Sequence, residues 1–220
     1  MPLHSYAHWC YPLSMPSDSI YQLKITLKNI KPPIWRSILI PADATFRDLH
    51  EAIQLSFGWT DSHLHDFSTE KDKYRGLYID RKITDLETLD GIDPWGEPPA
   101  DERKVTLRER LKQEEQHIAY MYDFGDSWEH DIILEKILPR DKNMEFPACI
   151  AGKRGCPPDD CGGTGGYEHL IAILADPKHE EHADMLEWLG IENAEEFDPE
   201  EFDAVTANEM LRDGYAAIAG

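Results

Sequence analysis

Alternation of apolar and polar residues predicts the first strands of the chain. Over residues 20–30, apolar side chains such as Leu23 and Ile25 occupy every second position, which is the period of a strand with one buried face. The Pro32-Pro33 pair interrupts this pattern, because proline lacks the amide donor that a strand needs. A second apolar segment follows over 35–40, so the two segments are predicted to form a hairpin.

Helical and strand patterns alternate along the rest of the chain. Thr45 and Asp48 have the spacing of a capping box, and apolar residues follow at helical intervals until Gly58. Two segments rich in proline and glycine, 80–104 and 142–166, are expected to be irregular. Further strands are predicted at 65–69, 77–79, 117–124 and 128–138, and further helices after Thr106, over 167–175, from Pro177 and from Asp198. The pattern predicts one α+β domain followed by a helical C-terminal extension.

Charge narrows the classes of partner. The 220 residues include 22 lysines and arginines against 43 aspartates and glutamates, for a net charge of −21. Such a chain is not expected to bind duplex nucleic acid or an anionic membrane. Residues 179–220 hold thirteen of the acidic residues and one arginine, which leaves −9 for the rest of the chain. We expect this acidic segment to be the solvated face of C-terminal helices, and a docking surface for a basic partner is the alternative.

Cysteine content and the N-terminus indicate the compartment. Cys149, Cys156 and Cys161, three of the four cysteines, lie in one short segment where a closed disulfide set would leave one thiol over. The first 19 residues contain no lysine or arginine, which fits neither a secretory signal nor a transit peptide. No apolar run approaches the ~18 residues of a membrane helix. We therefore expect a cytoplasmic protein with no membrane segment.

Four unusual strings stand out, and their order is informative. They are Pro32-Pro33-Ile34-Trp35-Arg36, then Phe57-Gly58-Trp59 leading to His63-Leu64-His65-Asp66-Phe67, then Tyr122-Asp123-Phe124-Gly125-Asp126-Ser127-Trp128-Glu129-His130, and last the segment from Cys149 through Cys156-Pro157-Pro158-Asp159-Asp160-Cys161 to Tyr167. In this order they resemble the plasmid pRiA4b ORF-3-like family. The resemblance implies a compact α+β domain with a mostly antiparallel sheet packed by helices, and no particular reaction. It divides the chain into an irregular N-terminal extension (1–19), this domain (20–175) and an acidic helical C-terminal extension (176–220).

The cysteine segment is the first candidate for a metal site. Cys149, Cys156 and Cys161 are separated by six and by four residues, and thiolates together with an imidazole suit zinc in a tetrahedral site. His65 is a candidate for the fourth ligand, as are His63 and His130. The alternatives are reduced thiols in a structural loop and a redox-active thiol.

A second group of candidates surrounds the turn after Tyr122. Asp123, Asp126 and His130 could bind a hard cation or act as acid and base. His63 and His65 could lie beside them, and they share one face because they are two residues apart on a strand. The alternative is a hairpin turn whose aspartates accept hydrogen bonds from backbone amides. A kinase is excluded, because the Asp-Phe-Gly triplet lacks the phosphate loop, strand lysine and catalytic loop that a kinase needs.

Two functions are compatible with these residues. The first is a non-enzymatic binding or regulatory module for a protein or small-molecule ligand, in which indoles line the binding face and the cysteine segment forms its rim. Packing of those indoles in the core is the alternative. The second function is a metal-dependent enzyme, such as a hydrolase, that uses zinc or another divalent cation. The candidate binding residues are Trp59, His63, His65, Asp123, Asp126, Trp128, His130, Asp159 and Asp160, and the candidate metal ligands are Cys149, Cys156, Cys161 and His65.

Overall fold

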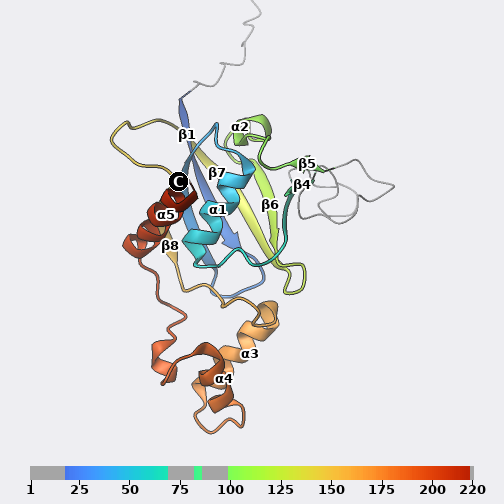
Figure 1. The fold of residues 1–220 in the computed structure, drawn as a ribbon, viewed down its shortest axis with the longest axis vertical. Coiled ribbons are helices and arrows are strands. Elements are labelled where there is room, and N and C mark those ends of the chain that lie inside the picture. The colour runs from blue at the N-terminus through green and yellow to red at the C-terminus, as the bar shows by residue number, and fades with distance from the viewer. Residues whose placement is uncertain (1–17, 69–81, 86–98, 219–220) are drawn as a thin grey trace, which may run out of the picture.

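The fold is α+β and is built on a single eight-stranded sheet (Figure 1). The computed structural model describes residues 18–68, 82–85 and 99–218, so the expected strand at 77–79 and all but the end of the expected N-terminal extension lie outside the described residues. The strand order is β5-β4-β3-β6-β7-β1-β2-β8, and all neighbours are antiparallel except β4 and β5. The strands are β1 (Ser19–Leu27), β2 (Ile34–Pro41), β3 (His65–Ser68), β4 (Lys82–Thr84), β5 (Ala100–Asp101), β6 (His117–Tyr122), β7 (Trp128–Pro139) and β8 (Ala148–Lys153).

The predicted alternation along the chain places one face of the sheet in the core. On β1 the side chains of Leu23 and Ile25 are fully buried, and on β7 Ile132 and Leu134 are buried beside them. The residues between them on both strands are half-buried and point to the opposite face. The hairpin of β1 and β2 is confirmed, with Ile25 paired to Arg36.

Helix α1 (Phe46–Phe57) covers the core face (Figure 1). It begins at Thr45, whose side chain and that of Asp48 form the predicted capping box, and it ends at Gly58, which has a φ of 83°. Leu49 and Ile53 are fully buried against the sheet. The predicted position and ends of this helix are confirmed.

The remaining helices lie beside α1 and at both ends of the sheet (Figure 1). Helix α5 packs beside α1, and the C-terminal segment is therefore partly core: Ala207 and Leu211 are buried in the main cluster. Close packing requires Gly214, since a Cβ there would lie 2.6 Å from the Leu55 side chain. The helices are α2 (Leu107–Arg110), α3 (Gly163–Ala175), α4 (His182–Leu189), the 3-10 helix η1 (Ala194–Glu196) and α5 (Ala204–Ile218).

Several predicted boundaries are wrong. The segments expected to be irregular contain the strands β4, β5 and β8. Strand β8 forms despite its weak apolar pattern, because it pairs with the free edge of β2, and β4 pairs with β5. The last helix begins at Ala204 rather than at Asp198, because Asp203 accepts hydrogen bonds from the amide and the hydroxyl of Thr206. Helix α4 begins five residues after Pro177, which lies in a turn. In the described part of the chain, no helix is long and apolar enough to cross a membrane.

Candidate functional site

Three loops meet at one end of the sheet and form what we call the loop corner, residues 59–64, 123–127 and 155–163. The indole nitrogen of Trp59 donates to the Pro157 carbonyl (2.9 Å), and the Gly162 amide donates to Oδ2 of Asp126 (3.0 Å). The Asp123 amide donates to the Leu64 carbonyl (2.9 Å). These bonds bring three of the four family-like strings together.

At the loop corner three of the candidate residues face one another. Nε2 of His63 lies 3.3 Å from Oδ1 of Asp160 and 3.8 Å from Oδ2 of Asp123. Asp123 and Asp160 both have positive φ angles, of 55° and 60°, a backbone conformation that aspartate tolerates better than most residues. The side chain of Asp123 is largely buried, whereas that of Asp160 is 69% exposed.

The other two aspartates of the loop corner have structural partners. Asp126 accepts the Gly162 amide and thereby fixes the start of α3. Asp159 accepts a hydrogen bond from the Thr60 hydroxyl (3.0 Å). Both side chains therefore hold loops in place. For Asp126, a bond from a backbone amide is what the alternative interpretation of the turn after Tyr122 predicts.

The structure does not gather the cysteines with His65. Cys149 lies on β8 with its amide bonded to Asn208, while Nε2 of His65 is bonded to Glu102 (2.6 Å). Among the described residues, the groups of three or more possible ligand atoms include no cysteine. Burial raises the pKa of Cys149, raises that of Cys156 well above its usual value and raises that of Cys161 to about 12, so all three are neutral thiols.

The expected indole-lined binding face is the interior of the protein, which corrects that prediction. Trp59 and Trp128 are 5% and 0% exposed, and His130 packs edge-on against Trp59 with ring centres 5.4 Å apart. Burial lowers the pKa of His130 to about 3, so its ring is neutral. The alternation on β7 correctly placed Trp128 and His130 on one face of the sheet. It could not indicate which face of the sheet α1 covers.

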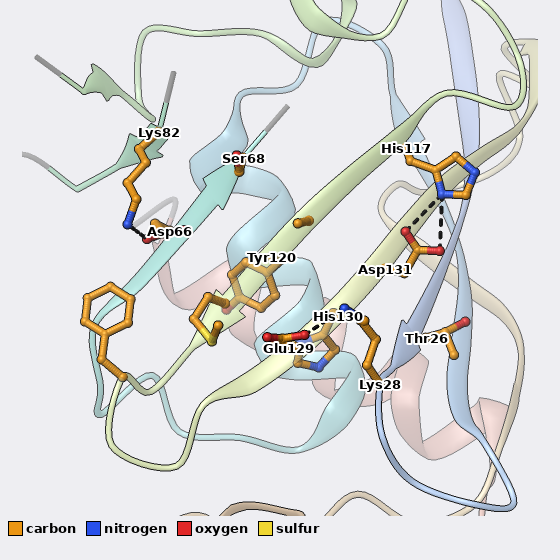
Figure 2. Close-up of a pocket in the computed structure, with 13 residues that line it drawn as sticks. Thr26, Lys28, Asp66, Ser68, Lys82, His117, Tyr120, Glu129, His130 and Asp131 are labelled. Carbon is orange, nitrogen blue, oxygen red and sulfur yellow. Dashed lines mark hydrogen bonds and ion pairs between the residues drawn. The ribbon is translucent and has the colours of Figure 1, made fainter. Parts of the chain in front are cut away.

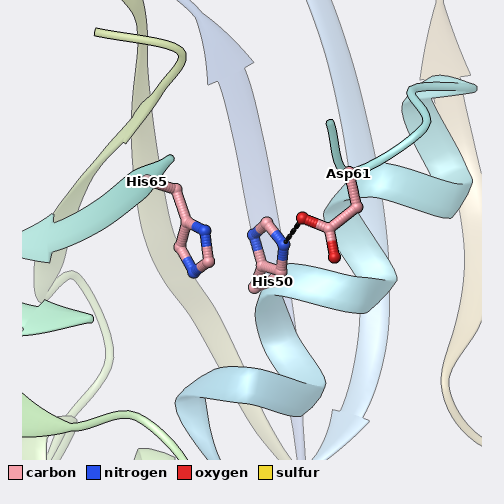
Figure 3. A group of neighbouring side chains, drawn as sticks. All are labelled: His50, Asp61 and His65. Atoms are coloured by element: carbon pink, nitrogen blue, oxygen red, sulfur yellow. Dashed lines mark hydrogen bonds and ion pairs between the residues drawn. The ribbon is translucent and has the colours of Figure 1, made fainter. Parts of the chain in front are cut away.

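A buried polar network includes His50, which the sequence patterns did not single out. Its Nδ1 lies 2.8 Å from the Tyr120 hydroxyl, and its Nε2 lies 2.7 Å from Oδ1 of Asp61. The ring stacks on that of His65, with centres 3.5 Å apart and planes 7° from parallel (Figure 3). Glu102, fully buried, bonds to His65 on the far side. The sequence offered one sign of this network, a histidine on the buried face of the predicted helix.

This network positions elements rather than binding an ion. A histidine nitrogen binds a metal in the plane of its ring, so two stacked parallel rings cannot both direct a lone pair at one ion. Both nitrogens of His50 already have partners, and burial lowers its pKa to about 4. The network therefore ties α1 to β3, β6 and the segment after β5.

A groove crosses the face of the sheet opposite α1 (Figure 2). Most of its lining side chains are exposed or half-buried, whereas Asp66 and Ser68 are buried, as are Tyr120 and His130, which belong to the core described above. Its volume is about 730 Å³, and its lining residues come from β4, β3, β6, β7, β1 and adjoining turns. Two small residues, Ser68 and Ala119, line the groove together with the larger apolar side chains of Met121 and Phe124. Phe124 is 47% exposed, so the groove includes an apolar surface in contact with water.

Ion pairs line the groove. Each joins side chains from neighbouring parts of the sheet, and each is at least partly exposed. The pairs are Lys82 with Asp66 (2.6 Å), Lys28 with Glu129 (2.7 Å) and His117 with Asp131 (2.9 Å). The lining of the groove therefore combines apolar side chains with charged groups of both signs.

The chain is similar to one protein family and to two proteins whose functions are unknown. The profile of the family described as plasmid pRiA4b ORF-3-like protein matches residues 19–206. The chain is 36% identical over 173 residues to the uncharacterised protein y4hQ of Sinorhizobium fredii (strain NBRC 101917 / NGR234), which covers 78% of this chain and 81% of that protein. It is also similar to the crystal structure of MM3350, a protein of unknown function from Methanosarcina mazei Go1, with a TM-score of 0.70, 40% identity and coverage of 85% of this chain and 96% of that one.

Proposed function

This chain belongs to the plasmid pRiA4b ORF-3-like protein family. From that premise we propose that it is a non-enzymatic binding module. In this proposal the groove holds an extended, basic and partly apolar segment of a partner protein. The observation that supports this function is the groove itself: a hollow on the sheet face opposite α1 that is lined by apolar and by charged side chains. The three free thiols, Cys149, Cys156 and Cys161, agree with a reducing compartment, and we place the module in the cytoplasm.

The dimensions of the groove suit an extended peptide. Its lining spans five neighbouring strands, and at about 4.8 Å between strands this corresponds to about 19 Å, the length of roughly six extended residues. Met121 and Phe124 offer a soft apolar contact for one or two side chains of such a peptide.

Charge favours a basic occupant. Three carboxylates, Asp66, Glu129 and Asp131, line the groove against two lysines, and the whole chain carries −21. Partly exposed ion pairs contribute only ~0–1 kcal/mol each, so a lysine or arginine of a ligand can take over a carboxylate at little cost. The field of an acidic protein also raises the rate at which basic partners arrive.

Peptide binding tests this function directly. We expect a fluorescently labelled peptide of repeated Lys-Val-Gly units to bind and to weaken as salt is added, while the matched Glu-Val-Gly peptide does not bind. Met121→Arg places a long cation in the lining of the groove and is expected to weaken binding by at least about tenfold, or ~1.4 kcal/mol. Fluorescence anisotropy measures both effects.

The matched control is Ile150→Arg, which adds the same charge on β8, outside the groove, at a side chain that is 43% exposed. It is expected to leave the affinity for the basic peptide nearly unchanged. Equal binding of the two peptides, or equal loss in the two variants, would show that the groove does not hold the peptide.

A further inference from the structure

We propose that His63, Asp123 and Asp160 at the loop corner bind one divalent transition-metal ion of the Zn²⁺ or Mn²⁺ type. The ligand atoms are Nε2 of His63 and one carboxylate oxygen from each aspartate, and all three lie within 4.8 Å of one another. The residues come from separate loops that the bonds described above hold together. This site is distinct from the groove, of which these three residues are not part.

The distances suit a shared ion. Metal–nitrogen and metal–oxygen bonds of about 2.0–2.2 Å in a tetrahedral site place neighbouring ligand atoms about 3.3–3.6 Å apart. Nε2 of His63 lies 3.3 Å from Asp160 and 3.8 Å from Asp123, so small rotations of exposed Asp160 and half-buried His63 complete the geometry.

The hydrogen bonding of the corner also points to a cation. Nε2 of His63 is shielded from solvent and has no hydrogen-bond partner in the described part of the chain, although two carboxylates lie beside it. Asp123 is only 8% exposed: its Oδ1 accepts the Gly125 amide (2.8 Å), and its Oδ2 faces His63 without a hydrogen bond. A metal ion between these atoms would satisfy the shielded imidazole nitrogen and the Oδ2 atom of Asp123 together, and it would offset the two negative charges.

The ligand set identifies the class of metal. One imidazole with two carboxylates suits Zn²⁺ or Mn²⁺, whereas Ca²⁺ and Mg²⁺ prefer oxygen ligands alone. Asp126 and Asp159 are engaged with Gly162 and Thr60 and are not needed as ligands. Because Asp160 is 69% exposed, the ion would have an open side for water or another ligand.

Metal titration tests the site. We expect chelator-treated protein to bind one Zn²⁺ or Mn²⁺ ion per chain in isothermal titration calorimetry. Asp160→Asn keeps the size of the side chain and tolerates the positive φ, and Asp160 is exposed, so this variant is expected to remain folded. It should weaken binding by at least about tenfold, and His63→Ala should do the same.

The matched control is Asp131→Asn, because His117 and Asp131 form an exposed pair at 2.9 Å that no third ligand group joins among the residues the structure describes. This variant should bind the metal as the unchanged protein does, and so should the groove variant Met121→Arg. Circular dichroism of each protein establishes that it is folded. Failure of the unchanged protein to bind either ion stoichiometrically, or unchanged binding by folded Asp160→Asn, would overturn the proposal whether or not the groove binds peptide.

Discussion

Lowering the pH from 7 to 4 is expected to remove about 3 kcal/mol of stability for each of two buried histidines, His50 and His130. Burial lowers their pKa values to about 4 and about 3, from an ordinary value near 6.5. Between these values and pH 6.5 the unfolded chain binds a proton at each residue while the folded chain does not. The stability contributed by neutral histidine is therefore complete above pH 6.5 and is lost as the pH falls.

His130→Phe isolates one of these contributions. The phenyl ring cannot ionise, and the pocket is already aromatic, with Phe57 and Trp59 beside the ring. Urea unfolding at pH 7 and pH 4 is expected to show a smaller loss on acidification for this variant, by about 3 kcal/mol. His169→Gln, at a largely exposed residue, is the control and should keep the full acid sensitivity. An unchanged pH dependence in His130→Phe would contradict the assignment of a neutral buried ring.

Glu102→Ala is expected to destabilise the fold by about 3–5 kcal/mol, because it removes one side of a buried charged network. The side chain is 0% exposed; its Oε2 bonds to His65 and its Oε1 lies 3.5 Å from the Arg47 guanidinium. Without Glu102, His65 keeps a buried ring nitrogen without its partner, and Arg47 loses one of its carboxylates. Thermal and urea unfolding measure the loss.

The neighbouring carboxylate provides the control. Asp101 pairs with Lys104, whose side chain is 79% exposed, and Asp101→Ala is expected to change stability little. Glu102→Gln should fall between the two alanine variants, since the amide can still bond to His65 but carries no charge. Unfolding of Glu102→Ala and Asp101→Ala at the same urea midpoint would contradict the buried network.

Regular patterns predicted the centre of the fold well. Alternation identified β1 and β7, and the Thr45 capping box with Gly58 identified α1, because in each case local chemistry and burial agree. The family-like strings correctly indicated the mostly antiparallel sheet. Strand β8 was missed because its small residues, such as Gly152, are selected by close contact: a Cβ there would lie 2.5 Å from the Phe202 ring.

The candidate residues were harder to assign, because their roles depend on which elements cover them. His63, Asp123 and Asp160 meet only through turns whose geometry no spacing rule fixes. His65 and His130 shared an expected face with the indoles, yet α1 covers that face. Glu102 lies in a polar stretch, and nothing local distinguishes it from the neighbouring Asp101; its burial is a property of the assembled network.

The packing of α5 beside α1 has a consequence for how the protein is made. The ribosome delivers α1 and the β1–β2 hairpin early, but Leu211 and Gly214, which complete the cover of the core, are synthesised more than 150 residues after Leu55. Until then the side of α1 that α5 covers has no partner in the part of the chain already made. A chain that ends before α5 is therefore expected to be less stable and more prone to aggregation than the full chain.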